Sequence, residues 1–238
     1  HTALALEALS HRYDWHGARA GFQRALEFNP DSVDALDWLA VTTHGIWGQP
    51  EEARHYSLRA READPHSVTV RYHTGLLQIW NGELEEARAS FQQLGDSGSS
   101  LFMRRHASAY VFMAQERYEE ALRAMERAVE VADQRVEIFT GMLGYLYGIV
   151  GKEEEAKAQL NRLDEMEAAG AYVSPVSRAH VHTGLGETSR ALDLLEKAYE
   201  GRTHWMIWLG RPPWTFKELQ SEPRYRKLLE RMAFPRAG

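Results

Sequence analysis

The sequence predicts an all-α protein built as a solenoid of repeated helix pairs. A small residue recurs every 34 or 35 residues along the 238-residue chain, at Ala18, Ala53, Ala87, Ala121, Ala156 and Ala191. Four of these alanines follow a glycine by five residues, at Gly48, Gly82, Gly151 and Gly186. A fixed period of this length is typical of repeat architectures, in which each unit packs on its neighbours.

Each repeat is expected to consist of two helices joined by a tight bend. The residues four and seven places after each alanine are mostly apolar, as in Ala18, Phe22 and Ala25, and they share one helix face. The residue twelve places before the alanine is small in four units, which lets the first helix approach this face. We expect units at about 1–32, 33–67, 68–100, 101–135, 136–170 and 171–200 in one continuous domain, with residues 96–100 as a loop.

These residues resemble the tetratricopeptide repeat (TPR), whose period is about 34 residues. The resemblance covers nearly the whole chain, with Glu116 in place of the turn glycine of the fourth unit and Ser57 in place of a large residue. It implies a right-handed α-solenoid of about six TPR helix-turn-helix units with a C-terminal capping segment. It also implies a non-catalytic protein-interaction module in which the first helix of each pair lines a concave surface.

The segment 201–238 breaks the period and is expected to cap the last unit. It contains an apolar cluster from Trp205 to Leu209, then Pro212 and Pro213. A helix from about Pro223 to Met232 would direct Tyr225, Leu228, Leu229 and Met232 inward. The alternative for this segment is a contact between two copies of the chain.

Two further stretches resemble the repeat regions of bacterial signalling proteins. They are the run from Trp214 to Pro235 and the sequence Tyr13-Asp14-Trp15. Such regions often follow a winged-helix, Ser/Thr kinase or nucleotide cyclase domain. The resemblance implies a cytoplasmic, regulatory C-terminal module of a larger bacterial signalling or transcription-regulatory protein, and the first residue, His1, fits a fragment.

The composition argues against several classes of function. The formal net charge is −6, so direct nucleic-acid binding is not expected, and cysteine is absent, so thiolate metal sites and thiol nucleophiles are excluded. The uncharged run from Ile138 to Gly151 is shorter than the ~20 residues that cross a bilayer. We therefore expect no membrane insertion.

A binding groove is predicted from the positions three before and one after the small residue of each first helix. Its candidate residues are rich in aromatic and histidine side chains: Glu7, Trp38, Thr42, Tyr72, Leu76, His106, Tyr110, Tyr145 and His180. Such side chains provide rigid contact area with a polar edge, suited to a peptide or protein segment. Two alternatives stay open: the groove binds a small molecule, or its aromatic rings fill a narrow interior and contact one another.

No motif for catalysis, metal or cofactor binding is found. His180 and His182 are two residues apart on an expected helix and so point to different faces, and no His-Glu-x-x-His sequence occurs. No nucleophile elbow, phosphate-binding loop or dinucleotide fingerprint is present. We expect no catalytic residues, no metal and no cofactor.

Overall fold

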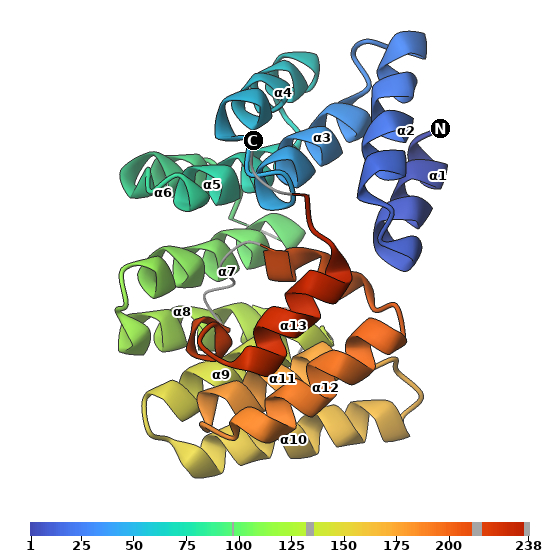
Figure 1. Ribbon diagram of the computed structural model, residues 1–238. Coiled ribbons are helices and arrows are strands. Elements are labelled where there is room, and N and C mark those ends of the chain that lie inside the picture. Colours follow the sequence, from blue (N-terminus) through green and yellow to red (C-terminus); the bar gives the residue numbers. More distant parts are fainter. Residues whose placement is uncertain (97, 132–135, 211–215, 236–238) are drawn as a thin grey trace.

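The computed structural model describes residues 1–96, 98–131, 136–210 and 216–235, and the regular elements among them are all helices. The predicted all-α solenoid is confirmed. Six antiparallel helix pairs follow one another from the blue end of the chain to the orange end (Figure 1). Because the array curls round, the red C-terminal helix α13 lies between the last pair and the first (Figure 1).

The helices of the array alternate between first and second members of each pair. They are α1 (Thr2–Glu7) with its π-helical continuation η1 (Ala8–Arg12), α2 (Trp15–Phe28), α3 (Val33–Gly45), α4 (Pro50–Ala63), α5 (Val68–Trp80), α6 (Leu84–Gln92), α7 (Gly98–Ala114), α8 (Tyr118–Val131), α9 (Glu137–Ile149), α10 (Glu153–Ala168), α11 (Pro175–Gly184) and α12 (Thr188–Glu200). The C-terminal segment forms the 3-10 turns η2 (His204–Gly210) and η3 (Lys217–Leu219) and the helix α13 (Pro223–Met232).

The helix ends are set by local signals in the sequence. Asp14 caps α2 by accepting a hydrogen bond from the Gly17 amide at 2.9 Å, and Ser67 caps α5 in the same way. Gly82 ends α5 with a φ of 80°, in the left-handed region that glycine enters without strain. Glu116 takes a φ of 58° at the equivalent bend, and its carboxylate accepts a hydrogen bond from Lys217 Nζ at 2.8 Å. The C-terminal segment thus contacts the turn of the fourth repeat, which is one of two repeat turns without a glycine; the other is at Tyr13, with a φ of 53°.

Small residues permit close packing both within and between repeats. A Cβ on Gly75 would lie 2.2 Å from the Phe91 ring of the paired helix. Between α9 and α11, a Cβ on Gly141 would lie 2.3 Å from the Ser177 carbonyl oxygen, and one on Gly184 would lie 2.3 Å from the Tyr145 carbonyl oxygen. The two inner helices therefore meet backbone to backbone, which leaves no space between them for a ligand.

The loop expected at residues 96–100 is shorter than predicted. Helix α7 already begins at Gly98, whose φ of 55° turns the chain directly into the helix, and the Asp96 carboxylate pairs with Arg104 on the next turns. Ser97 lies outside the described residues, as do Pro212, Pro213 and Trp214 of the C-terminal segment.

Helix α13 packs on the last repeat, where the C-terminal cap was expected. Its Tyr225, Leu228 and Met232 are buried and Leu229 is half-buried, while Arg224 forms an ion pair with Asp193 of α12 at 2.7 Å. Apolar burial and this surface ion pair together attach α13, the burial being the larger contribution.

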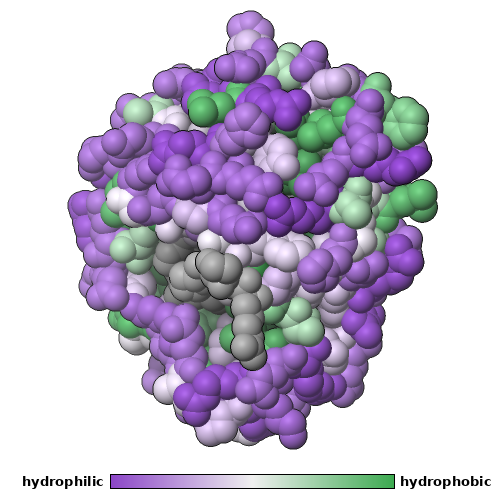
Figure 2. All heavy atoms as spheres, turned by 45° about the horizontal axis from the view of Figure 1, so that its top comes forward, coloured by the Kyte–Doolittle hydropathy of each residue, from purple (hydrophilic) through white to green (hydrophobic). Residues whose placement is uncertain are grey.

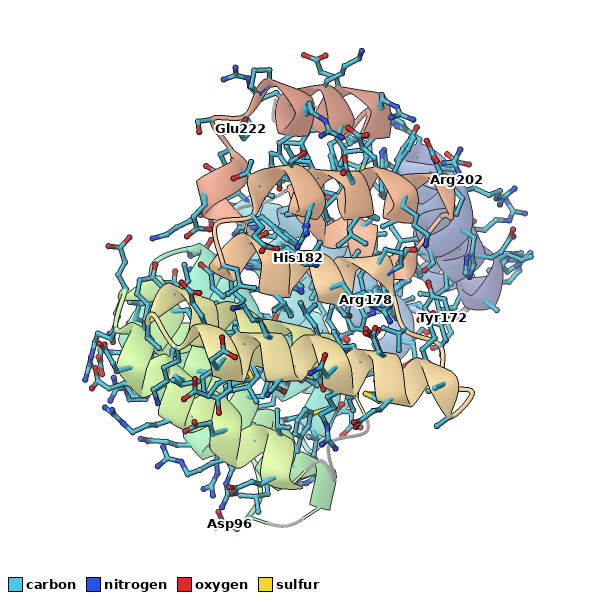
Figure 3. The ribbon with its side chains drawn as sticks, turned by 90° about the horizontal axis from the view of Figure 1, so that it is seen from below. Asp96, Tyr172, Arg178, His182, Arg202 and Glu222 are labelled. Atoms are coloured by element: carbon cyan, nitrogen blue, oxygen red, sulfur yellow. The ribbon has the colours of Figure 1, made fainter. Side chains whose placement is uncertain are left out.

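The same C-terminal segment also binds the first repeat, which the sequence did not predict. Tyr13 Oη donates to the Thr203 carbonyl oxygen at 2.9 Å, Trp15 Nε1 donates to the Met232 carbonyl oxygen at 2.9 Å, and the Trp15 ring stacks on Phe234. Arg202 lies beside this first repeat, with its guanidinium over the Tyr13 ring (Figure 3). These contacts close the array into a ring.

Ala121 tests the repeat register, because it is fully buried between helices. We expect Ala121→Glu to lower the free energy of unfolding by several kcal/mol, on the order of 4, since it overpacks the site and buries an unpaired charge. Urea unfolding followed by circular dichroism measures the effect. Arg123→Ala, on the exposed face of the same helix, is the control and should stay within about 0.5 kcal/mol of wild type. Equal stability of the two variants would show that the register is wrong.

Removal of the C-terminal segment tests its structural role. A chain ending at Gly201 would expose the faces of α12 that carry Leu192 and Leu195, both buried here. We expect lower stability and self-association, because large contiguous apolar surfaces promote association. Size-exclusion chromatography with light scattering and urea unfolding check this. A truncated chain that stays monomeric and equally stable would contradict the assignment.

Candidate functional site

The concave side of the array encloses an apolar cavity of about 350 Å³. The inner helices α3, α5, α7, α9 and α11 form one wall and the C-terminal segment forms the other. The described lining is predominantly aromatic and aliphatic, with four histidines: Trp38, Val41, Tyr72, His73, Leu76, Trp80, His106, Tyr110, Ile138, Phe139, Met142, Val176, His180, His204, Trp205, Trp208, Leu209 and Phe216. Small-molecule sites have this size and character.

Six of the nine candidate groove residues line this cavity. They come from successive inner helices, as expected for the first members of the pairs: Trp38, Tyr72, Leu76, His106, Tyr110 and His180. The spacing of four residues within a helix places Tyr72 and Leu76, and likewise His106 and Tyr110, on one face.

Glu7, Thr42 and Tyr145 do not line the cavity. Glu7 lies at the surface, 3.5 Å from Arg12, and the Thr42 hydroxyl donates to the Trp38 carbonyl oxygen within its own helix. Tyr145 is fully buried and its hydroxyl donates to Glu218 Oε1 at 3.1 Å. The close approach of α9 and α11 places Tyr145 inside the packing instead of in the groove.

The site includes residues that the repeat spacing missed. Trp80 continues the stripe of Tyr72 and Leu76 by one further turn of α5, so the spacing contained a signal for it. The side chains from the C-terminal segment had no such signal. The apolar cluster from Trp205 to Leu209 was visible in the sequence, but its position across the concave surface depends on contacts far along the chain.

The turn η2 occupies the concave surface with its apolar side chains. Met206, Ile207 and Leu209 are buried, and the Trp208 ring lies 6.1 Å from that of Trp80. Trp205 Nε1 donates to Glu137 Oε1 at 3.0 Å, and the other carboxylate oxygen accepts from the Ser177 hydroxyl. A peptide could lie along this surface only after η2 had left it.

Many of the cavity side chains contact one another, as in the alternative in which the aromatic rings fill a narrow interior. Tyr72 Oη and His106 Nδ1 are 2.9 Å apart in a hydrogen bond, and the His106 ring meets Phe139 edge to face at 4.2 Å. His180 stacks on Phe216 with the ring centroids 4.5 Å apart. These contacts hold the rings in place around the remaining space.

Two histidines of the cavity wall are uncharged at physiological pH. Burial lowers the pKa of His106 and that of His180 to about 3, so both imidazoles are uncharged. Among the described lining residues there is no Lys, Arg, Asp or Glu. His73 bonds to the buried carboxylate of Asp37 at 2.6 Å.

The described residues contain no group of three or more His, Cys, Asp or Glu side chains that could hold a metal ion. Among the described helices, none combines the length and the apolar character that crossing a membrane requires. The surface seen in Figure 2 is largely hydrophilic, with apolar residues scattered over it in small groups.

Comparison with known proteins agrees with the geometry of the repeats. Residues 48–100 match the family model of the tetratricopeptide repeat. This segment therefore carries a tetratricopeptide repeat. The fold of the chain is similar to the crystal structure of a tetratricopeptide repeat protein from Parabacteroides merdae ATCC 43184, with a TM-score of 0.63 and 17% sequence identity over 98% of this chain and 82% of that one. A comparison with curated proteins gives no match.

Glu137 makes the stability of the folded chain dependent on pH. Burial raises the pKa of Glu137 from 4.5 to about 7, against the opposing effect of the hydrogen bond from Trp205. As the pH rises, Glu137 ionises near pH 4.5 in the unfolded chain and near pH 7 in the folded chain. Its contribution to the stability of the folded state is therefore complete below pH 4.5 and is lost as the pH rises through 7. Because the side chain is partly exposed, we expect a loss of only about 2 kcal/mol.

The variant Glu137→Gln cannot titrate, so wild type should lose about 2 kcal/mol relative to it between pH 4.5 and 8. Urea unfolding at constant ionic strength across this range provides the measurement. Glu155→Gln, at an exposed position of α10, is the matched control and should follow the wild-type profile. Parallel profiles for wild type and Glu137→Gln would contradict the role of the carboxyl group.

Proposed function

We propose that this TPR chain is a non-catalytic sensor module that binds a small apolar molecule in its internal aromatic cavity. TPR arrays are interaction modules in general, and their ligands usually lie on the concave surface. In this chain the C-terminal segment covers that surface. The observation that carries the proposal is the cavity of about 350 Å³ left between the inner helices and this segment.

The energetics favour a small molecule over a peptide in this position. A peptide along the concave surface would have to displace Met206, Ile207 and Leu209, which are all buried. Exposing three large apolar side chains costs roughly 5–9 kcal/mol, from about 1.5–3 kcal/mol for each one. A molecule that fills the existing cavity avoids this cost.

The second candidate function is the binding of a protein segment in the groove, with displacement of η2. It is favoured by the way in which η2 itself lies there, with Trp205 and Trp208 among the aromatic side chains of the inner helices. A protein partner of this kind would be captured by wild type and by Arg123→Ala and lost by a folded Tyr72→Ala/Tyr110→Ala variant. The resemblance of the C-terminal run to bacterial regulatory proteins supports a cytoplasmic, regulatory module of a larger protein for both candidates.

Thermal unfolding in the presence of a panel of metabolites tests the first candidate. A ligand at 100 times its Kd stabilises the folded state by about 2.7 kcal/mol, which raises the Tm of a chain of this size by about 5–10 °C. Leu76→Trp, which fills the cavity, should abolish the shift, and the outer-face variant Arg123→Ala should keep it. The proposal fails if no compound raises the Tm, or if Leu76→Trp responds as wild type does.

A further inference from the structure

Two histidines of the cavity wall carry a ring nitrogen without a hydrogen-bond partner. His106 on α7 is 1% exposed, and its Nε2 is buried and unpartnered, while Nδ1 bonds to the Tyr72 hydroxyl. His180 on α11 is 6% exposed, and its Nδ1 is likewise buried and unpartnered. Buried polar groups are nearly always hydrogen-bonded in folded proteins, so two such atoms on one cavity wall need an explanation.

The rings that carry these nitrogens are fixed by their neighbours. His106 lies edge to face with both Tyr110 and Phe139, with centroid distances of 4.4 and 4.2 Å. His180 is stacked on Phe216, with an angle of 10° between the ring planes. Preorganised groups of this kind bind without losing side-chain freedom on association.

The charge of the site restricts the ligand. Burial keeps both imidazoles neutral, so neither offers a positive charge to an anion. The nearby carboxylates are already engaged, Asp37 with His73 and Glu137 with Trp205. A charged ligand would lose its hydration in an apolar cavity without gaining a partner of opposite charge.

The remaining surface favours a flat aromatic molecule. The lining presents ring faces and edges from Trp38, Tyr72, Trp80, Tyr110 and Trp208. Aromatic ligands gain offset-stacked and edge-to-face contacts with such rings, beyond the burial of apolar area.

We propose that the cavity takes one neutral aromatic molecule with a single hydrogen-bonding group, such as a phenol or an indole, and that the free nitrogens of His106 and His180 bind this group. A hydroxyl can bond to both nitrogens, whereas an indole N–H bonds to one of them. This inference rests on the proposed function and names the ligand class of the same site. A neutral imidazole has one donor and one acceptor nitrogen. Whichever way the proton lies between Tyr72 and His106, the free Nε2 keeps the capacity for one hydrogen bond.

Calorimetric titration of the full chain with six probes tests the inference. Phenol and indole have the proposed chemistry, toluene lacks the polar group, benzoate and benzyltrimethylammonium carry a charge, and cyclohexanol is not aromatic. We expect phenol or indole to bind about tenfold more tightly than each of the others, the ratio that a satisfied buried hydrogen bond supports.

The variants His106→Phe and His180→Phe keep an aromatic ring and remove the nitrogens. Each should weaken phenol binding about fivefold or more and leave toluene binding within about twofold. His66→Phe is the matched control, because it makes the same change at an exposed histidine outside the cavity. It should keep phenol binding within about twofold of wild type. Circular dichroism verifies the fold of each variant.

The ligand class and the proposed function are contradicted by different results. If toluene, benzoate, benzyltrimethylammonium or cyclohexanol binds as tightly as phenol and indole, or if both histidine variants bind phenol as wild type does, the ligand class is wrong while the cavity remains a binding site. If no probe binds, or if Leu76→Trp binds all of them unchanged, the proposed function fails as well. The comparison of probes in wild type needs no variant, so the test holds even where a substitution prevents folding.

Discussion

The burial of the turn η2 against the inner helices is the contact on which the rest of this structure depends. A single TPR helix pair cannot bury its own apolar face, and stacking solves this problem only between neighbouring units. The concave side keeps a stripe of aromatic side chains, including Trp38, Tyr72 and Tyr110, that no repeat covers. The C-terminal segment covers it with Trp205, Trp208, Leu209 and Phe216. The solenoid therefore has an interior, which an open array of the same repeats would lack.

This burial requires that the segment be fixed at both of its ends. On one side α13 packs on the last repeat, and on the other Tyr13 and Trp15 of the first repeat bond to the backbone of Thr203 and Met232. These hydrogen bonds join residues 190 and 217 positions apart in the sequence. Contacts between residues so far apart in the sequence close a long loop, and the entropic cost of closing a loop grows only slowly with its length. A few buried bonds and one stacked ring pair are thus enough to keep the ring closed.

The periodic part of this architecture could be predicted from the sequence, because each repeat is a local unit. Small residues such as Ala121 mark close helix contacts, and the turn glycines mark bends that need a positive φ. The groove positions followed from helix geometry, and the structure places Tyr72 and His106 in the cavity lining. They failed at Tyr145, because the backbones of α9 and α11 approach each other through glycines, and that depends on a neighbouring repeat. The course of the C-terminal segment has no period, so only its apolar character was visible beforehand.

The closed ring also decides how such a module could report a ligand. A ligand shifts an equilibrium only by the difference in its affinity for the two states. In the closed state His204, Trp205, Trp208 and Phe216 complete the cavity wall, and in a state with the segment released this wall would be missing. A ligand in the cavity therefore binds the closed state more tightly by necessity. The burial of η2 already favours the closed state by roughly 5 kcal/mol or more, so nearly all molecules are closed before a ligand binds. Its effect would fall on how rarely the ring opens, which requires that the contacts of Tyr13 and Trp15 between the first repeat and the C-terminal segment break.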